Sequence, residues 1–474
     1  MMRAMAMAGA LGWALTGSAL AQGLPAPVAS ALKAAAIPSA STAAFVQEVG
    51  SARPRLSHNG TQAMNPASTM KLVTTFAALE LLGPSFTWKT EAYAAGALQA
   101  EVLQGDLVLR GSGDPKLTVE NLWLMVKNQR ARGVREIAGE LVLDRSGFDA
   151  SEADPGRFDN EPLRPYNVAP DALLVNFKAF RFTFVPDAEG KSARVLVEPR
   201  SSLLELAHSV RLGDGPCNDW RARLKADFQS NGKGARASFG GVYPASCGEK
   251  TWNVALLPHA QYVYGVFRQL WEDAGGTLKG GVREGPVPSG ARLIYTHESP
   301  SLAEVVRNIN KFSNNVMARQ LFLTLSAEVL GPPAKSGRSA QVIRSWLAQR
   351  ELGIPELVME NGSGLSRQER ISAANLARLL LAAWSSAVMP EFIASMPLVA
   401  YDGTMKRRLK FESIAGQAHV KTGSLADVRS MAGYVLDRNN RRFAVVFFVN
   451  HANAGAAQAA MDALLRWVYE GAGG

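Results

Sequence analysis

The stretch Asn65-Pro66-Ala67-Ser68-Thr69-Met70-Lys71 places a serine and a lysine on one turn of a predicted helix. Asn65 is a typical N-cap, and Pro66 suits the first helical position because its missing N–H would be unpaired there anyway. Apolar residues then recur until a Gly-Pro pair ends the pattern. We therefore expect a helix over residues 66–82, with Ser68 and Lys71 within reach of each other on one face.

A serine and a lysine at this spacing can form a nucleophile and its base. The same spacing recurs at Ser30/Lys33 and at Ser230/Lys233. The first copy lacks a helix cap and the second lies in a Gly-rich segment, whereas Ser68 lies in the first turn of a capped helix. Free N–H groups and the helix dipole favour a developing oxyanion there. We therefore expect Ser68 to be an acylable nucleophile and Lys71 to be its base.

A second motif, Ser313-Asn314-Asn315, lies between helices expected over residues 302–312 and 314–329. A short loop at that point can turn polar side chains into a cleft. Asn314 or Ser313 is also a candidate N-cap of the second helix, and this role does not exclude a catalytic one. Ser-x-Asn also occurs at Ser57/Asn59, in a turn that precedes Ser68.

A third motif, Lys421-Thr422-Gly423-Ser424, contains the one Lys-Thr-Gly of the chain and ends an expected strand. Glycine lets a substrate backbone lie close to the strand edge, and the lysine and hydroxyl groups can bind a carboxylate. A lysine acts as a base only when burial or another cation lowers its pKa, and Lys421 is a candidate for that second cation beside Lys71.

The pattern of the chain changes at about residues 96 and 296. Helical patterns and strands alternate over residues 22–95 and 296–474, where further helices are expected at 340–349, 373–387 and 454–469. Residues 96–295 are rich in Gly, Pro and short alternating segments, with one expected helix at 119–132. The sequence thus predicts an α/β (α+β) domain formed by both ends of the chain, interrupted by one or two inserted domains made mainly of strands.

The N-terminus and the cysteines indicate export. Residues 1–21 combine a short positive start, an apolar segment and a small-x-small cleavage pattern ending at Ala21, which is typical of a signal peptide. We therefore expect a periplasmic protein. In such an oxidising compartment the two cysteines of the chain, Cys217 and Cys247, are expected to form a structural disulfide.

Several function classes have no support in the sequence. The 47% hydrophobic and 19% charged residues indicate a globular protein, and the net charge of +10 is scattered, so we expect a solvated basic surface and no nucleic-acid partner. No Gly-x-Ser-x-Gly, His-Glu-x-x-His or Walker A pattern occurs, which argues against a Ser-His-Asp hydrolase, a zinc peptidase or a nucleotide-binding enzyme. No metal or cofactor is expected.

The three motifs together, in the order Ser68, Ser313, Lys421, resemble the active-site signature of penicillin-binding proteins and serine β-lactamases. The large insertion after the first motif makes the chain similar to the class C low-molecular-mass penicillin-binding proteins, the D-alanyl-D-alanine carboxypeptidase/endopeptidase family of the penicillin-binding protein 4 type. The segments 109–115 and 361–366 also match, although Asn361 stands where that family is expected to have Asp. The resemblance implies a transpeptidase-like domain, with an antiparallel sheet flanked by helices.

The resemblance also implies roles for the motif residues. Ser68 would attack the penultimate D-alanine of a peptidoglycan stem peptide, Lys71 would accept the serine proton, and Ser313 would pass a proton to the leaving amine. The residues expected to bind substrate are Asn315, Lys421, Thr422, Gly423 and Ser424. The N–H groups of Ser68 and Ser424 would form the oxyanion hole. β-Lactams would acylate Ser68 as covalent inhibitors.

Two alternatives remain open from the sequence. A β-lactamase or esterase of the same fold would deacylate rapidly and would need an added carboxylate to activate water; the sequence identifies none. A non-enzymatic wall-binding or β-lactam-sensing protein would have no use for Ser68 and Lys71 together, and a sensor would need a transmembrane link. At most a peripheral contact with the membrane is expected.

Overall fold

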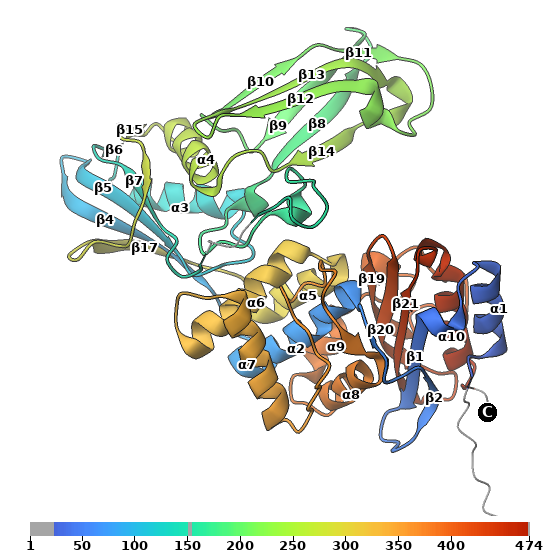
Figure 1. Cartoon of the computed structure of the whole chain (residues 1–474). Coiled ribbons are helices and arrows are strands. Elements are labelled where there is room, and N and C mark those ends of the chain that lie inside the picture. The colour runs from blue at the N-terminus through green and yellow to red at the C-terminus, as the bar shows by residue number, and fades with distance from the viewer. Residues whose placement is uncertain (1–22, 150–153, 473–474) are drawn as a thin grey trace, which may run out of the picture.

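The computed structural model describes residues 23–149 and 154–472, so the predicted signal peptide lies outside the described residues. The two ends of the chain form one antiparallel sheet in the strand order β19-β20-β21-β1-β2 (Figure 1). Its strands are β1 (Thr42–Glu48), β2 (Pro54–His58), β19 (Ala418–Ser424), β20 (Val428–Leu436) and β21 (Arg442–Asn450). Strand β1 pairs with β21 along its whole length, which confirms that both ends of the chain share a sheet.

Helices cover both faces of this sheet, as predicted. On one face lie α1 (Ala26–Ala34) and α10 (Gln458–Tyr469), which share a core with Phe447. The adjacent Phe448 points to the opposite core, which contains α8 (Ala373–Trp384). Because both faces are buried, β20 and β21 are nearly continuous runs of apolar residues and do not alternate with polar ones.

The remaining helices of this part pack on the α8 side of the sheet (Figure 1). They are α2 (Lys71–Leu82), α5 (Leu302–Phe312), α6 (Asn315–Leu330), α7 (Ser336–Gln349) and α9 (Met389–Ser395). A two-residue pairing of β3 (Ala63–Met64) with β18 (Ile371–Ser372) joins the start of α8 to the segment before Ser68. Helix α9 has no counterpart among the expected helices, whereas α5, α6 and α7 overlap the expected ranges and α2 ends where the sequence predicts.

The middle of the chain forms two further sheets above the helices (Figure 1). The strands of the first are β4 (Lys89–Gln99), β5 (Val102–Gly111), β6 (Glu136–Ile137), β7 (Leu141–Asp144), β15 (Thr277–Leu278), β16 (Val282–Glu284) and β17 (Arg292–Glu298). The strands of the second are β8 (Phe180–Asp187), β9 (Ser192–Glu198), β10 (Leu204–His208), β11 (Val210–Gly213), β12 (Leu224–Ser230), β13 (Ala235–Pro244) and β14 (Lys250–Val254). Strands β4 and β17 extend across the expected boundaries at residues 96 and 295, and the division into domains stays a prediction.

Two helices lie between these sheets, although the sequence predicts one. Helix α3 (Val119–Ala131) is the expected helix. Helix α4 (His259–Asp273) was not expected, so the prediction of a single helix in residues 96–295 is wrong. Aromatic and β-branched residues, which favour strands, fill the α4 segment. Its buried side chains nevertheless repeat at helical spacing, as Tyr262, Val266 and Phe267 show, because α4 packs its apolar face into the core of the inserted region.

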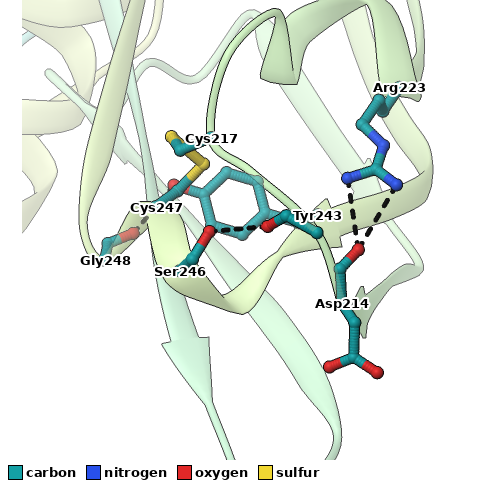
Figure 2. Close-up of a disulfide and its surroundings, with 8 residues drawn as sticks. Asp214, Cys217, Arg223, Tyr243, Ser246, Cys247 and Gly248 are labelled. Atoms are coloured by element: carbon teal, nitrogen blue, oxygen red, sulfur yellow. Dashed lines mark hydrogen bonds between the residues drawn. A yellow bond between two sulfur atoms is a disulfide. The ribbon is translucent and has the colours of Figure 1, made fainter.

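The disulfide between Cys217 and Cys247, predicted from the sequence, joins the segment that follows β11 to the segment that follows β13 in the second inserted sheet (Figure 2). Beside it, the Tyr243 hydroxyl donates a hydrogen bond of 2.8 Å to the carbonyl of Gly248. The bridge closes a loop with a sequence separation of 30 residues. Closing a loop of this length stabilises the fold by about 3 kcal/mol through the reduced entropy of the unfolded chain. Within the described residues, no helix is both long and apolar enough to cross a bilayer.

Candidate active site

Ser68 lies in a 3-10 turn and not, as expected, in the first turn of an α-helix. The turn spans Ala67–Met70, and α2 begins only at Lys71. Ala67 has a φ of +44°, which an α-helix does not allow, and the Asn65 side chain accepts a hydrogen bond of 2.9 Å from the Ala67 N–H. The expectation of one helix beginning at Pro66 is therefore wrong, but the turn still places Ser68 directly before α2.

Lys71 connects three segments of the chain. Its Nζ donates hydrogen bonds of 3.0 Å to Ser68 Oγ and 2.6 Å to Asn315 Oδ1, and another to the carbonyl of Ser363. Its side chain is completely buried. Burial, and next the positive charge of Lys421, hold the pKa of Lys71 well below its usual value. Lys71 thus has both the position and the lowered proton affinity of a base for Ser68.

Ser313 occupies the turn between α5 and α6. Its backbone is in the left-handed region, with a φ of +56°. This conformation ends α5, and α6 begins two residues later. Of the two candidates for the N-cap of α6, it is Asn314 that serves, since its side chain accepts a hydrogen bond of 3.0 Å from the Met317 N–H. The Ser313 hydroxyl is therefore free of capping and accepts a hydrogen bond of 2.7 Å from Lys421 Nζ.

The strand β19 brings Lys421 to this group from the far end of the chain. Lys421 is completely buried, and burial lowers its pKa to about 7. Two positions further along, a Cβ on Gly423 would lie 2.7 Å from the Ser68 nitrogen, so only glycine lets the strand edge pass so close to the nucleophile. Thr422 is half-buried and shares a hydrogen bond of 2.8 Å with Thr404, while Ser424 is exposed at the end of the strand.

The structure thus brings together the motif residues expected to carry chemistry. Ser68, Lys71 and Asn315 form one hydrogen-bonded group, and Ser313 and Lys421 form another beside it. The remaining copies of the motifs stay outside this group: Ser30, Lys33, Ser57, Asn59, Ser230 and Lys233. In the part of the chain that the structure describes, no cluster of His, Cys, Asp or Glu has the arrangement to hold a metal ion.

A loop over residues 360–369 contributes to the site; the resemblance includes its segment 361–366, but the sequence assigned it no role. Asn361, which stands where the resemblance leads one to expect Asp, accepts hydrogen bonds from the N–H and hydroxyl of Ser363 at 2.9 and 2.7 Å. The completely buried Glu369 accepts three bonds from the N–H groups of residues 360–362 through one oxygen. These bonds shape the turn that presents the Ser363 carbonyl to Lys71, and an amide such as Asn361 is sufficient for this role.

A comparison with protein families supports the same interpretation. Residues 24–470 match the model of the D-Ala-D-Ala carboxypeptidase 3 (S13) family. The chain belongs to this family. It is therefore a hydrolase of the serine peptidase type, with the penicillin-binding fold that its motifs predict.

Individual relatives support the assignment to this family. A D-alanyl-D-alanine carboxypeptidase of Actinomadura sp. is 30% identical over 80% of this chain and 72% of its own length. D-alanyl-D-alanine carboxypeptidase DacB of Haemophilus influenzae is 24% identical over 84% of this chain and 83% of its own. The crystal structure of penicillin binding protein 4 from the same organism superposes with a TM-score of 0.79 at 22% identity, covering 93% of this chain and 99% of that one. A predatory peptidoglycan endopeptidase of Bdellovibrio bacteriovorus shares the fold, with a TM-score of 0.52 at 15% identity, over 91% of this chain and 93% of that one.

Proposed function

We propose that this member of the family removes the terminal D-alanine of peptidoglycan stem peptides, or cleaves the D-alanyl bonds of their cross-links, through an acyl-enzyme on Ser68. The observation that carries the proposal is the hydrogen bond of 3.0 Å between Lys71 Nζ and Ser68 Oγ, next to the second pair formed by Lys421 and Ser313. A nucleophile with its base lies beside a cation that can bind a terminal carboxylate. The names of the relatives point to the same substrate class.

In the acylation step, neutral Lys71 accepts the proton of Ser68 as Oγ attacks the carbonyl carbon of the penultimate D-alanine. The oxyanion that forms is assigned to the N–H groups of Ser68 and Ser424. Gly423 supports this assignment, because it allows the end of β19 to approach the Ser68 nitrogen closely. Asn315, held by Lys71, is assigned to the amide of the bound peptide.

The leaving amine departs on the side of Ser313. The C–N bond breaks, the electron pair stays on nitrogen, and the proton taken from Ser68 reaches this nitrogen through the Ser313 hydroxyl. Lys421, with Thr422 and Ser424, is assigned to the carboxylate of the terminal residue, since it already donates to Ser313. Water then attacks the ester, which releases the shortened peptide and restores Ser68.

Labelled penicillin tests the nucleophile. A β-lactam presents a carboxylate and a strained amide in the same arrangement, so we expect a stable adduct on Ser68. Ser68→Ala should abolish it, while Ser230→Ala, at a copy of the motif outside the site, should leave it unchanged. An adduct that survives Ser68→Ala contradicts the proposal, and rapid turnover of penicillin assigns the chain to the β-lactamases instead.

Digestion of purified peptidoglycan tests the substrate. Loss of terminal D-alanine from monomeric pentapeptides indicates carboxypeptidase activity, and loss of cross-linked dimers indicates endopeptidase activity. Mass spectrometry of the muropeptides distinguishes the two. A wild-type enzyme that forms the penicillin adduct but alters no muropeptide would contradict the substrate while keeping the nucleophile.

We further infer that the protein works in the periplasm, after cleavage of a signal peptide near Ala21. The cell-wall substrate of the family and the Cys217–Cys247 disulfide support an exported protein. N-terminal sequencing of the protein recovered from the cell envelope tests this. A mature chain that retains Met1, or one found in the cytosol, would contradict it.

A further inference from the structure

We propose that a cavity beside Ser313 binds the leaving half of a cross-linked peptide, so that the enzyme recognises both strands of a cross-link. This inference rests on the proposed function. The cavity has a volume of about 720 Å³, within the usual range of ligand sites. Its floor is the turn from Phe312 to Val316, between α5 and α6. Its other walls come from the inserted region, including the start of α3 and the end of α4.

The position of this cavity matches the direction in which the amine departs. Ser313 and Asn315 line it, which places the cavity beside the candidate active site. Another cavity, of about 810 Å³, lies on the side of Asn361 and Ser366 and is lined by neither Ser313 nor Asn315. Because the proposed proton path to the leaving nitrogen passes through Ser313, we assign the group attached to that nitrogen to the cavity that Ser313 lines.

The inserted region, which supplies most of the cavity walls, is fastened to helix α6 directly after the turn at Ser313. Gln320 of α6 is completely buried; its amide accepts from the N–H of Asp171 at 2.8 Å and donates to the carbonyls of Asp171 and Gly113. One turn earlier on α6, Val316 packs in a small core with Val168 and Leu174 of the inserted region. The cavity is therefore part of the folded structure, with the inserted region as its roof.

The charges in the cavity suit a peptide that carries both signs. Arg200 and Asp273 form one ion pair at 2.6 Å, and Arg181 and Glu198 form a second at 3.8 Å; all four residues line the cavity. Their side chains are 43–71% exposed, so these pairs contribute little stability and can exchange partners with a ligand. A peptide with free carboxylate and ammonium groups can satisfy both arginines and both acids.

Two exposed aromatic rings supply the apolar contact. Phe312, at 65% exposure, and Tyr166, at 40%, both line the cavity. Large rings left open to water beside a catalytic group typically pack against a ligand. A departing D-alanine fills little of this volume, whereas the second stem peptide of a cross-link reaches both the rings and the ion pairs.

The test compares two substrates with the same acyl half: a pentapeptide that releases D-alanine, and a cross-linked dimer that releases a peptide. The variants are Arg181→Ala combined with Arg200→Ala, and Gln269→Trp, which fills the cavity from α4. We expect each to lower kcat/KM for the dimer about tenfold, a loss typical of a few contacts, while changing pentapeptide hydrolysis and penicillin acylation less than about twofold.

Arg236→Ala is the matched control, because Arg236 pairs with Glu205 on the surface of the same inserted sheet and does not line the cavity. It should leave both substrates unchanged. The proposal is overturned if the cavity variants leave dimer cleavage intact, if they slow both substrates equally, or if the wild type hydrolyses pentapeptide but no dimer. An effect seen only on dimers that retain their sugars would assign the cavity to glycan instead. Failure of the wild type on every substrate would contradict the proposed function itself.

Discussion

Lys421 Nζ donates a hydrogen bond of 2.7 Å to Ser313 Oγ, which joins the edge strand of the sheet to the turn between α5 and α6. The contact holds a cation beside the hydroxyl that we assign to the leaving group. It also places a positive charge close enough to Lys71 to lower the pKa of that base. In the proposed mechanism, one lysine therefore connects substrate binding with activation of Ser68.

This relationship predicts the alkaline side of the pH profile. Burial lowers the pKa of Lys421 to about 7, so the side chain loses its charge as the pH rises through that value. A neutral Lys421 attracts a carboxylate less strongly, and we expect kcat/KM for a pentapeptide to fall above about pH 7, mainly through KM. Steady-state kinetics from about pH 5 to about pH 9 measure this.

The control is a pentapeptide whose terminal carboxylate is replaced by an amide. Because this substrate has no charge for Lys421 to bind, its kcat/KM should be lower throughout and should lack the alkaline decline. If both substrates declined in parallel, Lys421 would not be the group that binds the carboxylate.

The close approach of β19 to Ser68 predicts a steric effect at Gly423. A Cβ at this position would lie 2.7 Å from the Ser68 nitrogen and 3.0 Å from the Pro66 carbonyl. Gly423→Ala must therefore push the strand edge away from the nucleophile, and we expect penicillin acylation to slow by about 100-fold or more. The overpacking should lower the free energy of unfolding by about 1–3 kcal/mol.

Gly455→Ala is the control for this effect, because the nearest atom to its Cβ would be 3.9 Å away, an ordinary contact. It should acylate as the wild type does. Normal acylation of Gly423→Ala would show that the oxyanion hole does not depend on the approach of β19.

The disulfide predicts a change in stability without a change in chemistry. Replacing both Cys217 and Cys247 by alanine removes the loop constraint, and we expect the free energy of unfolding of the inserted region to fall by about 3 kcal/mol. Urea unfolding measures the loss, and labelled penicillin reports on the site. If the double variant lost penicillin acylation together with stability, the bridge would also be needed to organise the catalytic turn.

Local motifs made most of the site predictable. Ser68 and Lys71 are recognisable from spacing and helix context, and Ser313 and Lys421 from short patterns on the expected elements. The 3-10 turn, with the positive φ of Ala67, was not predicted; it lies so close to Gly364, far away in the sequence, that no larger residue fits there. Tertiary packing also decided α4, whose residues favour strands when considered alone.

Two groups that act on Lys71 could not be assigned from the sequence either. The carbonyl of Ser363 is a backbone group and has no sequence signature, yet it accepts a hydrogen bond from the base. Glu369 could have been noticed only as one glutamate among many. Its role depends on complete burial under the loop at residues 360–362, which only the folded chain shows.

Glu369 and Arg319 lead to the last prediction, because they change the pKa of Lys71 in opposite directions. Burial and Lys421 lower that pKa most; the negative charge of Glu369 raises it, and the positive charge of Arg319 lowers it. Glu369 is completely buried and Arg319 is half-buried, so solvent screens the charge of Glu369 weakly and that of Arg319 in part. Acylation needs neutral Lys71, and its rate therefore falls on the acid side of the profile, where Lys71 becomes protonated.

Glu369→Gln removes the charge that raises the pKa of Lys71, so the acid limb of penicillin acylation should move to lower pH. Arg319→Gln removes a charge that lowers it, so the limb should move to higher pH. Stopped-flow acylation against pH measures both. Glu369 also binds the N–H groups of residues 360–362. If these residues acted only through packing, both variants would acylate more slowly, but the acid limb of the pH profile would not move. Two shifts of opposite sign would be the signature of buried charges that set the proton affinity of the base.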